Sequence, residues 1–254
     1  MKYGETAFDI LYLAIALVCG VVMLIKARGA TEKLMGIAVL ILGIGDAFHL
    51  VPRVINYFAA SDMTFWLGLG KLITSVTMTA FYVCMYYILL GVTQERERFG
   101  LTLFVWFLAA LRVGLCLLPQ NEWLTGGGEL VWAIVRNVPF VILGAVTVVL
   151  WIKKRSSLGR LRFIWLWVAL SFLFYIPVAA GASLVPELGM LMLPKTVCYI
   201  VIAVTFLAFI QNMVLKNPFN TMLFVLQRRK VQTILPYAYG RKQVLTVKPR
   251  YSIM

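Results

Sequence analysis

The segment GDAFHLVPR occupies residues 45–53, near the middle of an apolar stretch that runs from residue 34 to residue 57. Its three ionisable residues, Asp46, His49 and Arg53, are spaced i, i+3 and i+7, so they share one face of a helix. An ionisable side chain inside a bilayer costs about 2.5–3.5 kcal/mol. These side chains are therefore expected to face protein or water, where a binding site or a proton-handling site would use them.

This stretch is one of seven. The chain has 254 residues and is 62% hydrophobic, whereas a soluble domain is usually about 45–50% apolar. Each stretch reaches the roughly 17–25 residues that a spanning helix requires. The stretches cover residues 8–25, 34–57, 65–92, 101–118, 130–152, 163–183 and 188–215. The sequence therefore predicts an all-α polytopic membrane protein, with a seven-helix transmembrane domain over residues 1–216 and a basic cytoplasmic tail over residues 217–254.

The distribution of basic residues predicts the orientation of these helices. Of the 24 Lys and Arg residues, 18 follow the first, third and fifth stretches or lie in the tail, and the opposite loops contain none. By the positive-inside rule, the N-terminus is expected outside and the C-terminus in the cytoplasm, with the plasma membrane as the expected location. The basic tail is expected to face anionic membrane lipids and not nucleic acid.

Three short matches predict an internal repeat. Residues 25–26 resemble 152–153, residues 48–52 resemble 174–177, and residues 67–71 resemble 191–195, at offsets between 124 and 127 residues. The first three and last three helices would then form parallel repeats joined by the fourth helix, with Lys71 and Lys195 at equal depth. This three-plus-one-plus-three layout resembles, in architecture alone, sugar-efflux carriers of the SWEET type and, more loosely, microbial rhodopsins.

Every charge that is expected inside the membrane falls in the half predicted to face outside. The candidate ligand-binding residues are Asp46, His49, Arg53, Lys71, Ser75, Arg112, Arg136, Asn137, Tyr175 and Lys195. Because cations outnumber acids in this set, we expect an outward-facing polar cavity that binds a small anion or an anionic lipid headgroup. Pro139, Pro177 and Pro194 are expected to break helix hydrogen bonds nearby and free backbone groups for this cavity.

Structural roles stay open for several of these residues. Arg53 and Lys71 could extend to the outer interface instead of entering a cavity. Asp46 could form a structural ion pair with Arg53 or His49. His49 could equally be a hydrogen-bonded core residue.

Two classes of function fit the candidate residues. The first is a transporter or a ligand-sensing receptor, and a receptor would need a cytoplasmic partner protein, because no output domain is attached. The alternative is an integral-membrane lipid-modifying enzyme that uses Asp46 and His49 as an acid–base pair. The Gly-Asp at residues 45–46, followed by Leu and Pro, slightly resembles membrane lysoplasmalogenases. The second acidic motif expected from that resemblance is missing, so the activity is not transferred.

No metal and no cofactor are expected. The chain has one histidine, whereas a zinc hydrolase needs several. A retinal Schiff base on Lys195 would need a carboxylate counter-ion, and the third stretch contains none. The four cysteines lie within apolar stretches without metal-ligand spacing, and they are expected to be reduced packing residues.

Overall fold

The computed structural model describes residues 2–59, 62–125, 129–181 and 185–216. Within these residues the chain forms helices and no strands. The helices are α1 (Lys2–Lys26), α2 (Ala30–Phe58), α3 (Thr64–Thr93), α4 (Phe99–Leu117), η1 (Pro119–Asn121), α5 (Leu130–Lys154), η2 (Arg155–Ser157), η3 (Gly159–Phe163), α6 (Ile164–Gly181), η4 (Pro186–Leu191) and α7 (Met192–Lys216). The seven α-helices are each long and apolar enough to cross a membrane. The predicted all-α seven-helix fold is confirmed, and the chain is an integral, multi-pass membrane protein.

The chain divides into two units, Met1–Gln211 and Asn212–Met254. The first unit contains the seven-helix bundle as far as Gln211. Of the second unit, the structure describes the last turns of α7, and the predicted tail over residues 217–254 lies outside the described residues.

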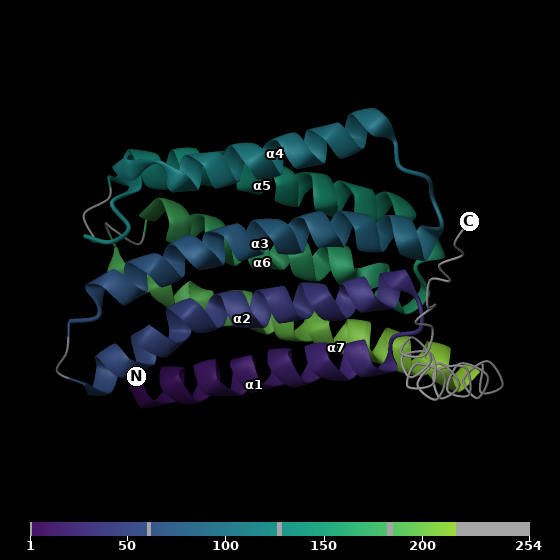
Figure 1. The fold of residues 1–254 in the computed structure, drawn as a ribbon, viewed down its shortest axis with the longest axis horizontal. Coiled ribbons are helices and arrows are strands. Elements are labelled where there is room, and N and C mark those ends of the chain that lie inside the picture. The colour runs from purple at the N-terminus through teal and green to yellow at the C-terminus, as the bar shows by residue number, and fades with distance from the viewer. Residues whose placement is uncertain (1, 60–61, 126–128, 182–184, 217–254) are drawn as a thin grey trace, which may run out of the picture. The chain divides into compact units, whose positions relative to one another are not determined.

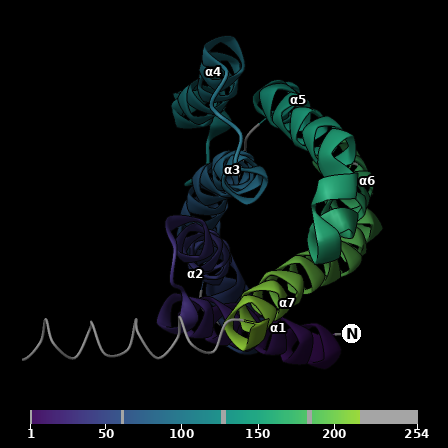
Figure 2. The ribbon, with the colours of Figure 1, turned by 90° about the vertical axis from the view of Figure 1, so that its right-hand side faces the viewer.

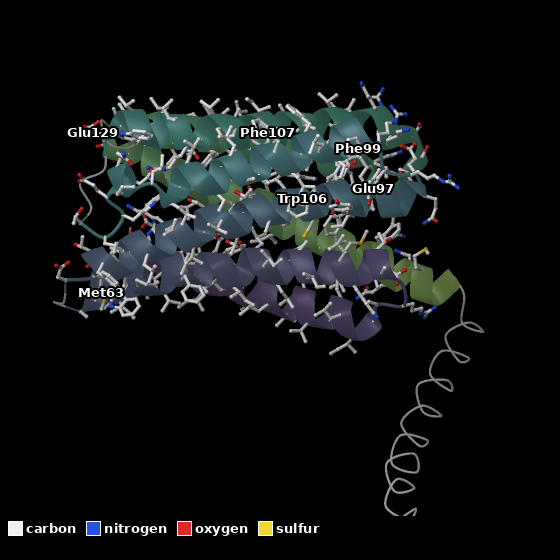
Figure 3. All side chains as sticks on the ribbon, turned by 45° about the horizontal axis from the view of Figure 1, so that its top comes forward. Met63, Glu97, Phe99, Trp106, Phe107 and Glu129 are labelled. Atoms are coloured by element: carbon white, nitrogen blue, oxygen red, sulfur yellow. The ribbon has the colours of Figure 1, made fainter. Side chains whose placement is uncertain are left out.

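Successive helices run in opposite directions along the long axis of the bundle (Figure 1). Met63 and Glu129 lie at one end of the bundle, which we call the N-terminal end because α1 begins there (Figure 3). Glu97 and Phe99 lie at the opposite end, which we call the basic end (Figure 3). The basic end carries Lys26, Arg28, Arg96, Arg98, Lys153, Lys154, Arg155, Arg160 and Arg162. The charge asymmetry in the sequence is thus an asymmetry between the two ends of the bundle.

Sequential helices are neighbours in the bundle. Helix α2 packs between α1 and α3, and α5 packs beside α6. Helix α4 contacts both α3 and α5, and α7 lies beside α6 on one side and near α1 on the other (Figure 2). This order brings together, around a common interior, the halves of α2, α5, α6 and α7 that lie at the N-terminal end of the bundle, although α2 is far from the other three helices in the sequence.

The backbones of α2 and α3 approach each other closely, because glycines line their contact. A Cβ added at three positions would overlap the other helix: Gly45 against Thr77, Gly70 against the carbonyl of Phe48, and Gly91 against Thr31. Small residues at helix interfaces allow such close packing in membranes. Gly45 precedes Asp46 and Gly70 contacts the turn that contains His49, so this contact also positions both candidate residues.

Two of the three prolines lie inside helices that continue past them, where a proline still removes one backbone hydrogen bond because it has no N–H. Helix α5 continues through Pro139 and α6 continues through Pro177. Pro194 lies in the first turn of α7, where the missing N–H donor has no helical partner to lose. The surrounding bundle therefore holds these helices together despite the prolines, and the candidate site is built from side chains.

An aromatic cluster fills the middle of the bundle. Tyr82 of α3 packs edge-on against Phe140 of α5, with ring centroids 5.2 Å apart, and lies 5.3 Å from the ring of Phe172 of α6. The Tyr82 hydroxyl lies 3.2 Å from that of Tyr199 on α7 and 3.4 Å from that of Ser171 on α6. This cluster joins α3 to the opposite side of the bundle and forms the floor beneath the polar residues.

Candidate functional site

Helices α1 and α2 meet along a polar face at the N-terminal end. Arg53 forms a 3.1 Å ion pair with Glu5, and its Nε donates to the hydroxyl of Tyr57. Tyr57 in turn donates a 2.7 Å hydrogen bond to the same Glu5 carboxylate. Arg53 is thus paired with Glu5 and not with Asp46.

Asp46 finds its partner on α1. The hydroxyl of Tyr12 donates a 2.5 Å hydrogen bond to the Asp46 carboxylate. The Tyr12–Asp46 hydrogen bond and the Glu5–Arg53 ion pair lie in one register of two antiparallel helices. Seven residues separate Glu5 from Tyr12 on α1, and seven residues separate Asp46 from Arg53 on α2. Because equal steps along antiparallel helices stay level, Asp9, three residues before Tyr12, is level with His49, three residues after Asp46.

Asp9 and His49 both carry buried polar atoms without a partner. Asp9 is 3% exposed, and its Oδ2 accepts no hydrogen bond from the described residues. The Nδ1 of His49 and the Oγ1 of Thr6 are likewise without a partner there. His49 is also hydrogen-bonded to the backbone of Leu67 on α3. Unpartnered buried polar atoms are uncommon in native proteins, so each of these three atoms marks a position where a water molecule or a ligand group would be accommodated.

Sequence reasoning missed the contribution of α1. The candidate residues predicted from the sequence include none from the first apolar stretch, which is predicted to begin at residue 8, whereas α1 begins at Lys2 and includes both Glu5 and Asp9. A signal was present in the sequence, because Glu5, Asp9 and Tyr12 are spaced i, i+4 and i+7 and therefore share one helix face. The acids near the candidate site are thus Glu5 and Asp9 in addition to Asp46.

Arg112 is the most deeply buried cation of the candidate set. It is 2% exposed, and its guanidinium carbon lies 3.6 Å from the ring centroid of Phe140. Its Nη1 donates a 3.1 Å hydrogen bond to Oδ1 of Asn137, and its Nε has no partner among the described residues. No described carboxylate lies within ion-pair distance of Arg112.

Asn137 and Tyr175 join Arg112 to α6. Tyr175 donates a 2.7 Å hydrogen bond to Oδ1 of Asn137, the same oxygen that accepts from Arg112. The amide nitrogen of Asn137 donates to the carbonyl of Ala133, which fixes the orientation of the amide. Two donors therefore converge on one carbonyl oxygen from α5.

Lys195 of α7 completes this group. It is 9% exposed, and its ammonium lies 5.0 Å from the ring centroid of Tyr175 and 5.4 Å from that of Tyr199. Asp46 and Arg112 are both within electrostatic range of Lys195. Among the described residues, no carboxylate forms an ion pair with Lys195. We call Arg112, Asn137, Tyr175 and Lys195 the cationic cluster.

Arg136 is held at the edge of this cluster by the connection after α4. Its Nη1 donates a 2.7 Å hydrogen bond to Asn121, and its guanidinium lies 4.2 Å from the centroid of the Trp123 ring. Asn121 donates to the carbonyl groups of Leu115 and Cys116 in the last turn of α4 and to that of Leu118 just after it. Arg136 is therefore a well-positioned cation within electrostatic range of Arg112.

Lys71 and Ser75 lie farther from the cluster. Lys71 is exposed, in contrast to Lys195, and it lies within electrostatic range of Arg136 and His49. The hydroxyl of Ser75 donates a 2.8 Å hydrogen bond to the carbonyl of Lys71 within α3. The structure thus brings Arg112, Asn137, Tyr175 and Lys195 together beside Asp46, with Arg136 and Lys71 at the edge and Arg53 in a separate ion pair.

A pocket on the outside of the bundle reaches the cationic cluster between α5 and α6. It has a volume of about 220 Å³, and its lining is apolar except for Asn137. The lining residues are Ile134, Asn137, Val138, Val141, Ile142, Ile176, Ala179 and Ala180. Asn137, which bonds to both Arg112 and Tyr175, is the residue of the cationic cluster that lines this pocket.

The described residues contain no cluster of His, Cys, Asp and Glu that could hold a metal ion. Comparison with known protein families, with curated proteins and with solved structures finds no match. The class of protein that the fold defines is a seven-helix integral membrane protein, and its chemistry is that of the residues described above.

Proposed function

We propose that this membrane protein binds a small anion, or the anionic headgroup of an amphiphile, at the cationic cluster, and that it acts as a transporter or a sensor. The observation that carries the proposal is the environment of Arg112. Its guanidinium is buried against Phe140, has an unpartnered Nε and lacks a carboxylate partner among the described residues. A buried charge without a counter-charge is strongly unfavourable, so a bound anion would stabilise this arrangement.

The hydrogen bonds of the cluster suit an anionic oxygen. A guanidinium and a phenol both donate to Oδ1 of Asn137. Charge-assisted hydrogen bonds of arginine to carboxylate or phosphate are stronger than those to a neutral amide. An anion beside Asn137 would therefore compete well for the donors of Arg112 and Tyr175.

Charge balance supports the same conclusion. Arg112 and Lys195 are both buried, and the nearest acid in electrostatic range of Lys195 is Asp46. The Asp46 carboxylate already accepts the hydrogen bond of Tyr12. The two buried cations Arg112 and Lys195 therefore have one acid, Asp46, in electrostatic range of Lys195, and an anion bound beside Arg112 would improve this balance.

The pocket between α5 and α6 favours an anion that also carries an apolar group. Its walls are aliphatic and its polar lining residue is Asn137. Ligand sites commonly combine apolar walls with a few polar groups that fix orientation. An organic carboxylate or an acidic lipid fits this pattern better than an inorganic ion.

The geometry supports binding more than the acid–base enzyme. Asp46 accepts its hydrogen bond from Tyr12, and its neighbour on the same face, His49, interacts with the backbone of Leu67. A general acid–base pair requires the two groups, or the substrate proton, within hydrogen-bond reach. Asp46 and His49 thus bond to Tyr12 and Leu67 and not to each other, and Nδ1 of His49 is the atom of the pair that has no partner among the described residues.

The test is ligand-dependent thermal stabilisation of the purified full-length chain, screened over organic carboxylates, organic phosphates and acidic lipids. Saturating binding raises the midpoint of unfolding by mass action. Arg112→Lys and Lys195→Gln are expected to remove that rise. Arg155→Gln, an exposed cation at the basic end, is the control and should retain it.

Reconstituted vesicles then separate the functional classes. Accumulation of the stabilising anion that is lost in Lys195→Gln supports transport, and binding without accumulation supports a sensor. Turnover of a bound lipid that Asp46→Asn abolishes would support the enzyme instead. Stabilisation by no anion, or equal stabilisation of Arg112→Lys and the unchanged protein, would overturn the proposal.

A further inference from the structure

A pocket with several positively charged residues in its lining lies at the basic end, between α3, α4 and α5. It has a volume of about 220 Å³ and is lined by Tyr86, Leu89, Leu90, Glu95, Arg96, Arg98, Leu101, Leu150, Lys153 and Lys154. The floor of this pocket is aliphatic and aromatic, and its rim is charged. It lies at the opposite end of the bundle from the cationic cluster (Figure 3).

The rim has an excess of cations. Lys154 forms an ion pair with Glu95, the one acid that lines the pocket. Arg96, Arg98 and Lys153 then remain, and none of them has an ion-pair partner among the described residues. All three are exposed, so their charged groups are available to a ligand from outside the chain.

An apolar groove leads into this pocket along α4 and α5. The groove has a volume of about 470 Å³, and its lining is aliphatic and aromatic apart from Lys153 at one end. It shares three lining residues with the basic pocket, namely Leu101, Leu150 and Lys153. Phe104 on α4 and Ala145 on α5 line the groove farther from the rim. Charge and apolar surface are therefore continuous, with Lys153 at the junction.

We infer that this continuous surface binds an anionic glycerophospholipid. The phosphate would lie among Arg96, Arg98 and Lys153, and an acyl chain would lie in the groove past Phe104 and Ala145. Basic pockets between transmembrane helices bind anionic headgroups, and anionic lipids concentrate in the cytoplasmic leaflet, which the basic end is predicted to face. A soluble phosphate would use the rim and leave the groove empty, so the groove identifies the ligand as a lipid.

This site is independent of the proposed function. It shares no residue with the cationic cluster and requires neither transport nor sensing, and its overlap with the pocket between α5 and α6 is confined to Val141 and Ile142 of the groove. A lipid here would fix the position of α4 against α5, whatever the cationic cluster binds.

The test counts lipids on the full-length chain by native mass spectrometry, after titration with phosphatidylglycerol or phosphatidylcholine of equal chain length. We expect phosphatidylglycerol to bind more tightly. Arg98→Gln and Lys153→Gln are each expected to weaken it about fivefold, the equivalent of about 1 kcal/mol for each cation near an anionic surface. Arg155→Gln, a cation outside the pocket, should bind as the unchanged chain does.

A separate variant tests whether the apolar groove takes part in lipid binding. Ala145→Trp fills the groove from an exposed position and should reduce phosphatidylglycerol binding, whereas Ala110→Trp, at an exposed position of α4 outside the groove, should not. Thermal unfolding checks that each variant is folded. Equal binding of the two lipids, or undiminished binding by Ala145→Trp, would overturn the inference. Competition by glycerol 3-phosphate as strong as that by the lipid would also overturn it, because the site would then be one for soluble anions.

Discussion

The hydroxyl of Tyr12 on α1 donates a 2.5 Å hydrogen bond to the carboxylate of Asp46 on α2. Tyr12 is 1% exposed, so the contact lies in the interior of the bundle. The Glu5–Arg53 ion pair follows in the same register. These two contacts align α1 with α2 and hold Asp46 beside the cationic cluster.

Tyr12→Phe is expected to destabilise the protein by about 1–3 kcal/mol, because the Asp46 carboxylate loses its hydrogen-bond donor while it stays inside the bundle. Thermal or denaturant unfolding in a fixed detergent measures the loss. Asp46→Asn and the double variant complete a double-mutant cycle. A coupling energy of about 0.5–3 kcal/mol is expected for residues in contact, and strict additivity would contradict the assigned contact.

Gly70→Ala is expected to destabilise the protein, since a Cβ there would overlap the carbonyl of Phe48 and force α3 away from α2. Overpacking of this kind costs about 1–3 kcal/mol. Gly114→Ala in α4 is the matched control, because a Cβ at Gly114 meets no atom within 4 Å. The control should be neutral or slightly stabilised by the better helix propensity of alanine. A Gly70→Ala protein as stable as the control would show that the two helices are less closely packed.

Asn137→Asp is expected to keep the fold and remove the anion-dependent thermal shift. The new carboxylate would accept from Arg112 and Tyr175 and neutralise the buried guanidinium, so a ligand would have no charge left to compensate. Asn137→Leu, in contrast, leaves both donors without an acceptor and should cost about 1–3 kcal/mol for each unsatisfied group. Retention of the full shift in a folded Asn137→Asp protein would place the anion elsewhere.

Cysteines introduced at Glu122 and Glu187 are expected to react with a membrane-impermeant maleimide added outside intact cells. A cysteine at Arg155 should react after permeabilisation alone. The reason is the excess of cations at the basic end, which favours retention of that end in the cytoplasm. Labelling at Arg155 in intact cells would reverse the assigned orientation.

Much of the fold could be predicted from the sequence, because each spanning helix requires a long apolar stretch and seven such stretches are present. The structure extends the first of them from residue 8 back to Lys2, which brings Glu5 into the same helix as Asp9. Hydropathy alone excludes such residues, since a polar face lowers the average of a window without preventing a helix. The proposed repeat and the orientation in the membrane stay predictions.

The candidate site could be predicted in part. The pattern of charges predicted which residue types form the candidate site and at which end of the bundle they lie. It did not predict the side chains that hydrogen-bond to them or pack against them. Tyr12, Asn121 and Trp123 engage Asp46 and Arg136 from other helices or from a connection. Such partners depend on how helices are placed around the bundle, and one sequence contains no direct signal for that.

The glycine contacts of α2 and α3 have a mechanical consequence. A Cβ at Gly45 or Gly91 would overlap a threonine side chain of the other helix, and one at Gly70 would overlap the Phe48 carbonyl, so the close approach at three levels opposes sliding of one helix past the other. These two helices therefore move as one body. Across the interior, α3 meets α6 and α7 through the hydroxyl contacts of Tyr82, which are weaker and easier to exchange. If α6 and α7 shift against this pair, the hydroxyl contacts of Tyr82 with Ser171 and Tyr199 are the ones expected to exchange.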